Sequence, residues 1–204
     1  MDDPIEISPY GKASTMIFDL CDDEKEIPLI SSRRFPKLKN VRIKGLRAEK
    51  MMIIKLIDWD HMPKLERIEI DSQVDCKDLL NKLSSNQILK ESLGYLSISG
   101  SNVNSTEIGE LSSLSKLRIL KIDKINDSEN FFDQCSKLIN LKSLFIGEYF
   151  NASSNSVKKM FSCLKNLEVF QVPQFDKTEI LEGFFDFLES KKEAVTNLKA
   201  LNIG

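Results

Sequence analysis

His61, in the segment DWDHMPKL, is the only histidine and the residue best suited to acid–base or metal chemistry at neutral pH. Asp58 and Asp60 precede it, so an imidazole and two carboxylates, all groups that bind divalent metal ions, are neighbours in the sequence. Neither a regular ligand spacing nor a second cluster of ligands supports a metal site. We therefore expect a polar turn here, with Trp59 packed in the interior and no metal ion bound.

The sequence contains no recognised catalytic motif. GxSxG, P-loop, GxGxxG and HExxH strings are all absent. Ser-His-Asp catalysis would have to use His61, and the sequence context marks no serine as a nucleophile. We expect a protein that is not an enzyme, carries no cofactor and takes no small-molecule substrate.

Four cysteines lie far apart in the chain: Cys21, Cys76, Cys135 and Cys163. This spacing makes no CxxC metal motif, and the thiols of an intracellular protein stay reduced. We expect Cys135 and Cys163 to be buried as small apolar side chains. The N-terminal segment MDDPIEISPYGK lacks the apolar stretch of a secretory signal, so we expect an intracellular location, cytoplasmic or nuclear. Three N-x-S/T sequons, whose use the sequence leaves open, begin at Asn104, Asn126 and Asn151.

The charge distribution argues against a nucleic-acid or membrane partner. The formal net charge is −2, and the longest apolar run, residues 51–57, is too short to cross a bilayer. Residues 33–50 form a band of eight basic side chains and one acidic one, between two acidic flanks. Such alternation favours ion pairs between neighbouring segments over a track for phosphates, so we do not expect nucleic acid to bind.

A recurrent phrase organises most of the chain. In segments such as LRILKIDKIN and LKSLFIGEYF, a leucine is followed by apolar residues three and five positions later, with polar residues between. This alternation predicts a strand with one buried face. The phrases begin at Leu38, Leu65, Leu93, Leu117, Leu141, Leu167 and Leu198, at intervals of 24 to 31 residues, and a weaker copy lies at Ala13, Met16 and Phe18. Repetition on this scale predicts a solenoid of stacked units.

The phrase resembles the repeat of the leucine-rich repeat family from about residue 13 to Gly204. The resemblance implies an α/β solenoid, or horseshoe, with a parallel sheet on its concave face and helices on its convex face. Asn or Cys, which the family favours at the ninth position, is missing here, so we expect a divergent, irregular array.

The linkers between phrases have one apolar face at helical period, which predicts a helix in each. They read AEKMMIIKLIDWD, CKDLLNKLSSNQILKESL, STEIGELSSLSKL, SENFFDQCSKLINL, SSNSVKKMFSCLKNL and DKTEILEGFFDFLESKKEAVTNL. Ser105 is the expected cap of the third. Linkers of this length are typical of the longer-repeat varieties of the family. We expect a single domain, residues 1–204, of about seven repeats plus a partial N-terminal one. Because no capping repeat follows the last phrase, we expect a fragment of a larger protein or a chain that closes against a partner.

Residues between the apolar positions of each strand are expected on the concave face. On the first two full phrases these are mainly charged, whereas later phrases place apolar groups there. We expect the partner-binding residues to be Tyr95, Ile119, Lys121, Asp123, Phe145, Val169 and Gln171. Phe145 would be the central aromatic, unless the segment EYFNASSN that begins at Glu148 folds over it.

The resemblance implies a protein-interaction module that binds another protein through the concave sheet. Two hypotheses stay open: a substrate-recognition or adaptor arm of a ubiquitin-ligase-type complex, and the ligand-sensing arm of a larger nucleotide-binding immune-type receptor. A GTPase activator is a third and weaker idea, because no arginine stands out as a catalytic finger. Nothing in the sequence discriminates between these hypotheses.

Overall fold

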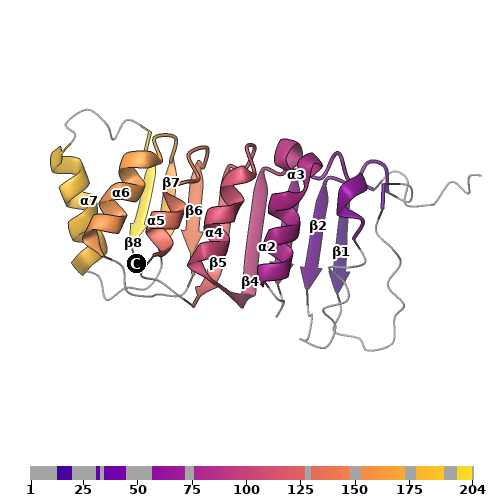
Figure 1. The fold of residues 1–204 in the computed structure, drawn as a ribbon, viewed down its shortest axis with the longest axis horizontal. Helices are drawn as coiled ribbons and strands as arrows, with labels where there is room; N and C mark the ends of the chain where they lie inside the picture. The colour runs from indigo at the N-terminus through magenta and orange to yellow at the C-terminus, as the bar shows by residue number, and fades with distance from the viewer. Residues whose placement is uncertain are drawn as a thin grey trace, which may run out of the picture.

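Eight strands form one parallel sheet, in which the order of the strands follows the order of the chain (Figure 1). The computed structural model describes residues 13–19, 31–32, 35–44, 57–71, 76–126, 130–147, 153–172, 178–190 and 197–203. The strands are β1 (Thr15–Asp19), β2 (Asn40–Lys44), β3 (Arg67–Asp71), β4 (Tyr95–Val103), β5 (Ile119–Ile125), β6 (Ser143–Ile146), β7 (Val169–Val172) and β8 (Ala200–Ile203). Every phrase, including the weak N-terminal copy, therefore forms a strand, and the predicted parallel sheet is confirmed.

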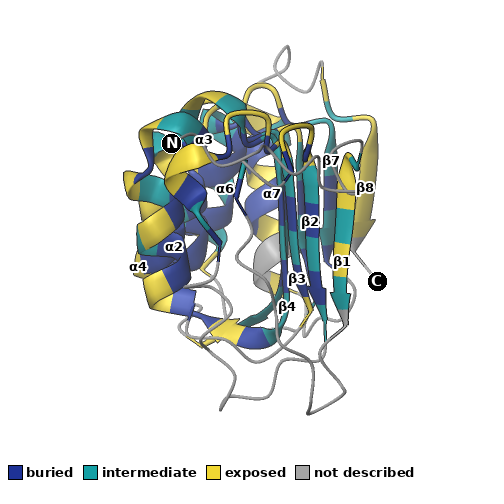
Figure 2. Ribbon diagram, turned by 90° about the vertical axis from the view of Figure 1, so that its right-hand side faces the viewer, coloured by how far each residue is buried: buried dark blue, intermediate teal, exposed yellow. Residues whose placement is uncertain are grey.

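The helices all cover the same face of the sheet, and the other face carries none within the described residues (Figures 1 and 2). They are α2 (Cys76–Ser85), α3 (Gln87–Ser92), α4 (Ser105–Glu110), α5 (Phe131–Cys135), α6 (Ser154–Cys163) and α7 (Thr178–Ser190), with short 3-10 helices η2 (Trp59–His61) and η3 (Leu111–Ser113). The helix predicted before Leu65, residues 48–60, lies mostly outside the described part of the chain, which resumes at residue 57.

A tight turn before the strand defines most units. The N–H of the phrase leucine donates to the carbonyl three residues earlier, as in Leu117 to Leu114 at 3.0 Å and Leu141 to Leu138 at 2.9 Å. Both residues of each pair are buried, so the turn anchors the strand to the interior. This contact explains why an apolar residue three positions before the leucine recurs in FPKL, MPKL, LSKL, LINL and LKNL.

The core lies between the sheet and the helices. Strand burial alternates residue by residue, and register aligns equivalent side chains, so that Leu96, Leu120, Leu144 and Phe170 form one buried row. Aromatic rings fill the C-terminal half of this core: Phe131, Phe132, Phe161, Phe170, Phe184 and Phe187. A single unit could not bury these side chains alone, because its neighbours in the stack cover it on either side.

The last strand is less covered than its equivalents. β8 pairs with β7 alone in the described sheet, and Leu201 is 37% exposed, whereas Leu120 at the same position of β5 is fully buried.

The cap of α4 differs from the prediction. Asn104, not Ser105, is the N-cap: the Glu107 carboxylate accepts from the Asn104 backbone N–H at 3.0 Å and from its side-chain Nδ2 at 2.9 Å, while the Glu107 backbone N–H donates to the Asn104 carbonyl at 3.2 Å. This reciprocal capping box satisfies two otherwise unpaired donors. Ser105 becomes the first helical residue and is buried.

Candidate functional site

The uncovered face of the sheet, which we call the concave face, carries the polar half of each strand. Register places equivalent residues side by side across the strands, which lie about 4.8 Å apart. One row contains Arg42, Glu69, Ser97, Lys121, Phe145, Gln171 and Asn202, and the row before it contains Asn40, Arg67, Tyr95, Ile119, Ser143, Val169 and Ala200. The seven predicted partner-binding residues all lie on this face and are all half-buried.

Ion pairs organise the charged part of this face, on β2 and β3. Arg67 Nε donates to Glu69 Oε1 at 2.6 Å. Arg42 Nε lies 3.2 Å from Glu69 Oε2, an ion pair that is not aligned as a hydrogen bond. One carboxylate is therefore shared between two guanidinium groups from neighbouring strands.

Cation–π contacts continue this arrangement across β4, β5 and β6. The Arg67 guanidinium lies 3.5 Å from the centre of the Tyr95 ring. Lys121 Nζ lies 5.8 Å from the Tyr95 ring centre and 4.6 Å from that of Phe145. Contacts of this kind contribute about 0.5–2 kcal/mol, depending on exposure. These six connected residues come from both of the register rows described above. We call them together the concave-face row: Arg42, Glu69, Arg67, Tyr95, Lys121 and Phe145.

Asp123 lies on the same strand as Lys121, and its carboxylate leans towards β6. A Cβ built at Gly147 would lie in contact with Asp123 Oδ1, so the missing side chain at 147 leaves room for the carboxylate. Next to it, the register between β4 and β5 shifts after Ile98, where Gly100 has a φ of 78°. That left-handed conformation suits glycine because other residues would pay a steric penalty.

The other three predicted residues surround this centre. Ile119 pairs in register with Tyr95 and Ser143, Val169 pairs with Ser143, and Gln171 pairs with Phe145. Ser143 therefore separates the two aliphatic side chains. The segment expected to compete for Phe145, EYFNASSN, lies mostly outside the described residues.

Sequence reasoning missed the part that arginine plays at this site. Arg67 is one of the charged residues expected on this face in the first two phrases, and in the structure it stacks on Tyr95 and joins the charged strands to the aromatic ones. The sequence does contain a pattern that predicts this contact, because Arg67 and Tyr95 occupy the same position of adjacent phrases.

The ion pairs predicted for the basic band are present. Lys39 Nζ lies 2.7 Å from Glu66 Oε1, and Arg42 pairs with Glu69, in both cases between β2 and β3 units. Some of the described basic residues of this band therefore form ion pairs with the neighbouring repeat, as the alternation of acidic and basic segments indicated.

His61 lies in the polar turn that the sequence predicted. Its Nδ1 is 2.9 Å from Asp58 Oδ1, and this hydrogen bond together with the negative charge of Asp58 raises the pKa of His61 above 6.5. Trp59 is buried, as expected. Asp60 turns instead towards Asn86 and Lys82, and the described residues contain no group of three or more His, Cys, Asp or Glu that could hold a metal ion.

The cysteines in the described residues form no disulfide bond. Cys76 and Cys135 are buried, and burial raises the pKa of the Cys135 thiol, which keeps it protonated and unreactive. Cys163 was predicted to be buried but is only half-buried, because it is the last residue of α6.

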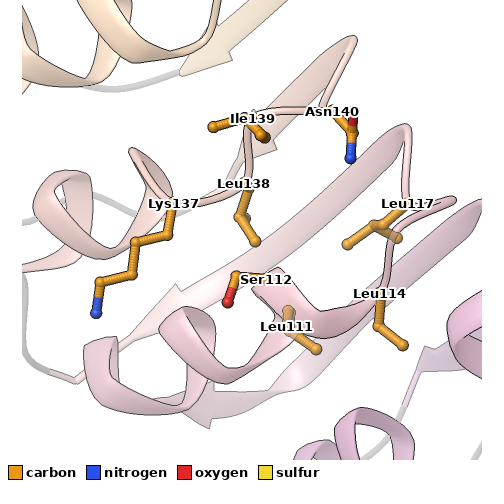
Figure 3. Close-up of a pocket in the computed structure, with 8 residues that line it drawn as sticks. All are labelled: Leu111, Ser112, Leu114, Leu117, Lys137, Leu138, Ile139 and Asn140. Atoms are coloured by element: carbon orange, nitrogen blue, oxygen red, sulfur yellow. The ribbon is translucent and has the colours of Figure 1, made fainter. Parts of the chain in front are cut away.

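Two hollows lie away from the concave face. Figure 3 shows the first, lined by the turns that lead into β5 and β6, among them Leu114, Leu117 and Leu138; it holds about 10 Å³, too little for more than one water molecule. The second measures about 550 Å³ and opens beside Gly94, between Glu66 and Arg118. This hollow forms because Gly94 has no side chain, whereas Glu66 and Arg118, at the equivalent positions before the neighbouring strands, have long charged ones.

Ion pairs connect the starts of the last three strands along the same edge. Glu168 accepts from Lys142 Nζ at 2.8 Å and from Lys199 Nζ at 2.7 Å. These two hydrogen bonds, first that from Lys142, lower the pKa of Glu168 from 4.5 to about 2. The carboxylate therefore stays ionised in the folded protein at pH values where it would be protonated in the unfolded chain.

Replacing Glu168 with glutamine should make thermal stability less dependent on pH. A depressed pKa stabilises the fold above the unfolded value of 4.5, and this contribution disappears as the pH falls towards about 2. We expect a small decrease in melting temperature for Glu168→Gln at pH 6, because the pair is solvent-exposed, and no difference near pH 2. Glu91→Gln, at a carboxylate without an ion pair in the described chain, is the control. A constant difference between Glu168→Gln and wild type at every pH would contradict this linkage.

None of the helices in the described segments is long and apolar enough to cross a membrane.

The parallel sheet in chain order, with helices on one face and a leucine-anchored turn before most strands, is an α/β leucine-rich repeat solenoid. No model of a protein family and no curated protein matches the sequence. Among solved structures, the chain is similar to the crystal structure, at 1.91 Å resolution, of an internalin (inlF) from Listeria monocytogenes str. 4b F2365. The TM-score is 0.54 and the sequence identity 14%, over 84% of this chain and 49% of the internalin chain. This chain spans about half the length of that internalin, and the likeness shows the fold.

Proposed function

We propose that this protein is an interaction module that binds a partner protein through its concave face. The observation that carries the proposal is the concave-face row, which runs over five adjacent strands and combines half-buried aromatic rings with charged groups. Aromatic and arginine side chains held on a rigid surface are the residues that dominate binding energy at protein interfaces. The surrounding Ile119 and Val169 add apolar area, and Asp123 and Gln171 add polar contacts.

The finer proposal is a substrate-recognition or adaptor arm of a ubiquitin-ligase-type complex inside the cell. The absence of a disulfide bond at Cys76, Cys135 and Cys163 fits a reducing compartment. The alternative is the sensing arm of a larger nucleotide-binding immune-type receptor. The identity of a captured partner separates them: ligase subunits support the adaptor, whereas a foreign or signalling ligand supports the receptor arm.

Replacing Phe145 with alanine should abolish partner capture and leave the fold intact. Phe145 is half-buried and faces outward from β6, so its loss should shift the melting temperature by no more than about 2–4 °C, the effect of 1 kcal/mol in a protein of this size. The loss of a central aromatic anchor should weaken binding at least tenfold. Capture from native lysate, quantified by mass spectrometry beside a melting curve, measures both effects.

Phe185→Ala is the matched control, because Phe185 is an aromatic residue that is 55% exposed on α7, on the helical side of the protein. Partners lost with Phe145→Ala and retained with Phe185→Ala support binding at the concave face. Retained partners in Phe145→Ala, with a melting temperature several degrees lower, would show that Phe145 stabilises the fold and does not contact a partner.

A further inference from the structure

Lys121 differs from the lysines at the start of the strands. Lys39, Lys142 and Lys199 each lie within 2.8 Å of a glutamate oxygen. Lys121, in contrast, forms no ion pair or hydrogen bond with any residue that the structure describes. Its ammonium group instead makes cation–π contacts with the rings of Tyr95 and Phe145. The three N–H donors of its ammonium group therefore have no described acceptor in the protein.

The neighbouring carboxylates on the concave face do not supply that acceptor. Glu69 is engaged by Arg42 and Arg67. Asp123 is two residues further along the same strand, so its backbone is about 6.6 Å from that of Lys121. Its carboxylate leans over Gly147. The rings of Tyr95 and Phe145 therefore position Lys121 near the centre of the concave face, and no described carboxylate pairs with its charge.

We propose that Lys121 recognises a carboxylate of the partner, from an aspartate or glutamate that is flanked by an apolar side chain. This inference rests on the proposed function and specifies the chemistry of the partner at the same site. The concave-face row carries three cations and one carboxylate, and with Asp123 beside it the cations still outnumber the carboxylates, so an acidic segment complements this face better than a basic one. A carboxylate that approaches Lys121 would lie between two aromatic rings, where partial exclusion of water strengthens a charge-assisted hydrogen bond. The flanking apolar group would cover Phe145.

A random peptide library displayed on phage, selected on the intact protein, tests this chemistry without a known partner. We expect selected peptides to share an acidic residue next to an apolar one. Changing that residue to its amide, Glu to Gln or Asp to Asn, should weaken binding to the wild-type protein by about tenfold or more. The same peptide change should have no effect on Lys121→Met, which keeps the length and apolar character of the stem but not the charge. Lys121→Glu should select basic residues instead.

The control is Lys116→Met, which removes one positive charge at an exposed residue beside the Gly94 hollow, away from the concave face. Peptides whose binding depends on Phe145 but not on their own acidic residue would overturn the role of Lys121 and leave the proposed function standing. Failure to select any peptide that depends on Phe145 or Lys121 would overturn both. Equal losses in Lys121→Met and Lys116→Met would reduce the effect to net charge and also overturn the inference.

Discussion

Replacing Phe170 with alanine is expected to lower the free energy of unfolding by about 3–5 kcal/mol, the cost of removing a fully buried aromatic ring. Phe170 is fully buried and packs edge-to-face on Phe161, with ring centres 5.2 Å apart, and on Phe132, at 6.2 Å. Phe161 in turn contacts the rings of Phe184 and Phe187 in α7. Truncation would leave a cavity where β7 meets α5 and α6, the helices that carry Phe132 and Phe161.

Phe170→Leu is the matched variant, because Leu96, Leu120 and Leu144 occupy the same register position on neighbouring strands. Leucine is the residue that the repeat favours here, so we expect it to retain more than half of the stability that alanine loses. Urea unfolding followed by circular dichroism measures both. A loss below about 1 kcal/mol for Phe170→Ala would mean that the aromatic cluster collapses around the gap, and that the C-terminal core is less tightly packed than its burial indicates.

The strands and the rows on the sheet could be predicted from the sequence because repetition removes the ambiguity of single segments. A short run such as LKSLFI fits several structures, but seven similar phrases in one register specify both the buried face and the neighbours of each strand. The placement of Lys121 beside Phe145 follows from this register alone.

Features that depend on local competition could not be predicted in the same way. Asn104 and Ser105 are both good caps, and the choice between them depends on which one the Glu107 carboxylate can reach. The lengthened strand β4, with its shifted register at Gly100, has no equivalent in the other phrases. The stacking of Arg67 on Tyr95, in addition to its pairing with Glu69, depends on the rotamer of a long flexible side chain.

Replacing Gly183 with alanine is expected to destabilise the protein by about 1–3 kcal/mol, as overpacking in a closely packed region does. Glycine inside a helix normally costs up to 1 kcal/mol relative to alanine, so a substitution in the middle of α7 would otherwise be stabilising. Here a Cβ at position 183 would lie in contact with the Ser154 carbonyl oxygen and 2.8 Å from Val157 Cβ. Both atoms belong to α6, and the carbonyl is backbone, so α6 and α7 would have to move apart.

Gly109→Ala in α4 separates this close approach from helix propensity. A Cβ at position 109 would also meet another atom, but that atom is the Gln134 side-chain oxygen, at the end of a flexible chain that can turn away. We expect Gly109→Ala to be neutral or slightly stabilising in the same unfolding experiment that shows the loss for Gly183→Ala. A loss of stability in Gly183→Ala without a loss in Gly109→Ala would locate the constraint in the backbone contact between α6 and α7. If both variants were neutral, α7 would have room to move on α6, and the helix that supplies Phe184 and Phe187 to the C-terminal core would be held by its aromatic side chains and not by close backbone packing.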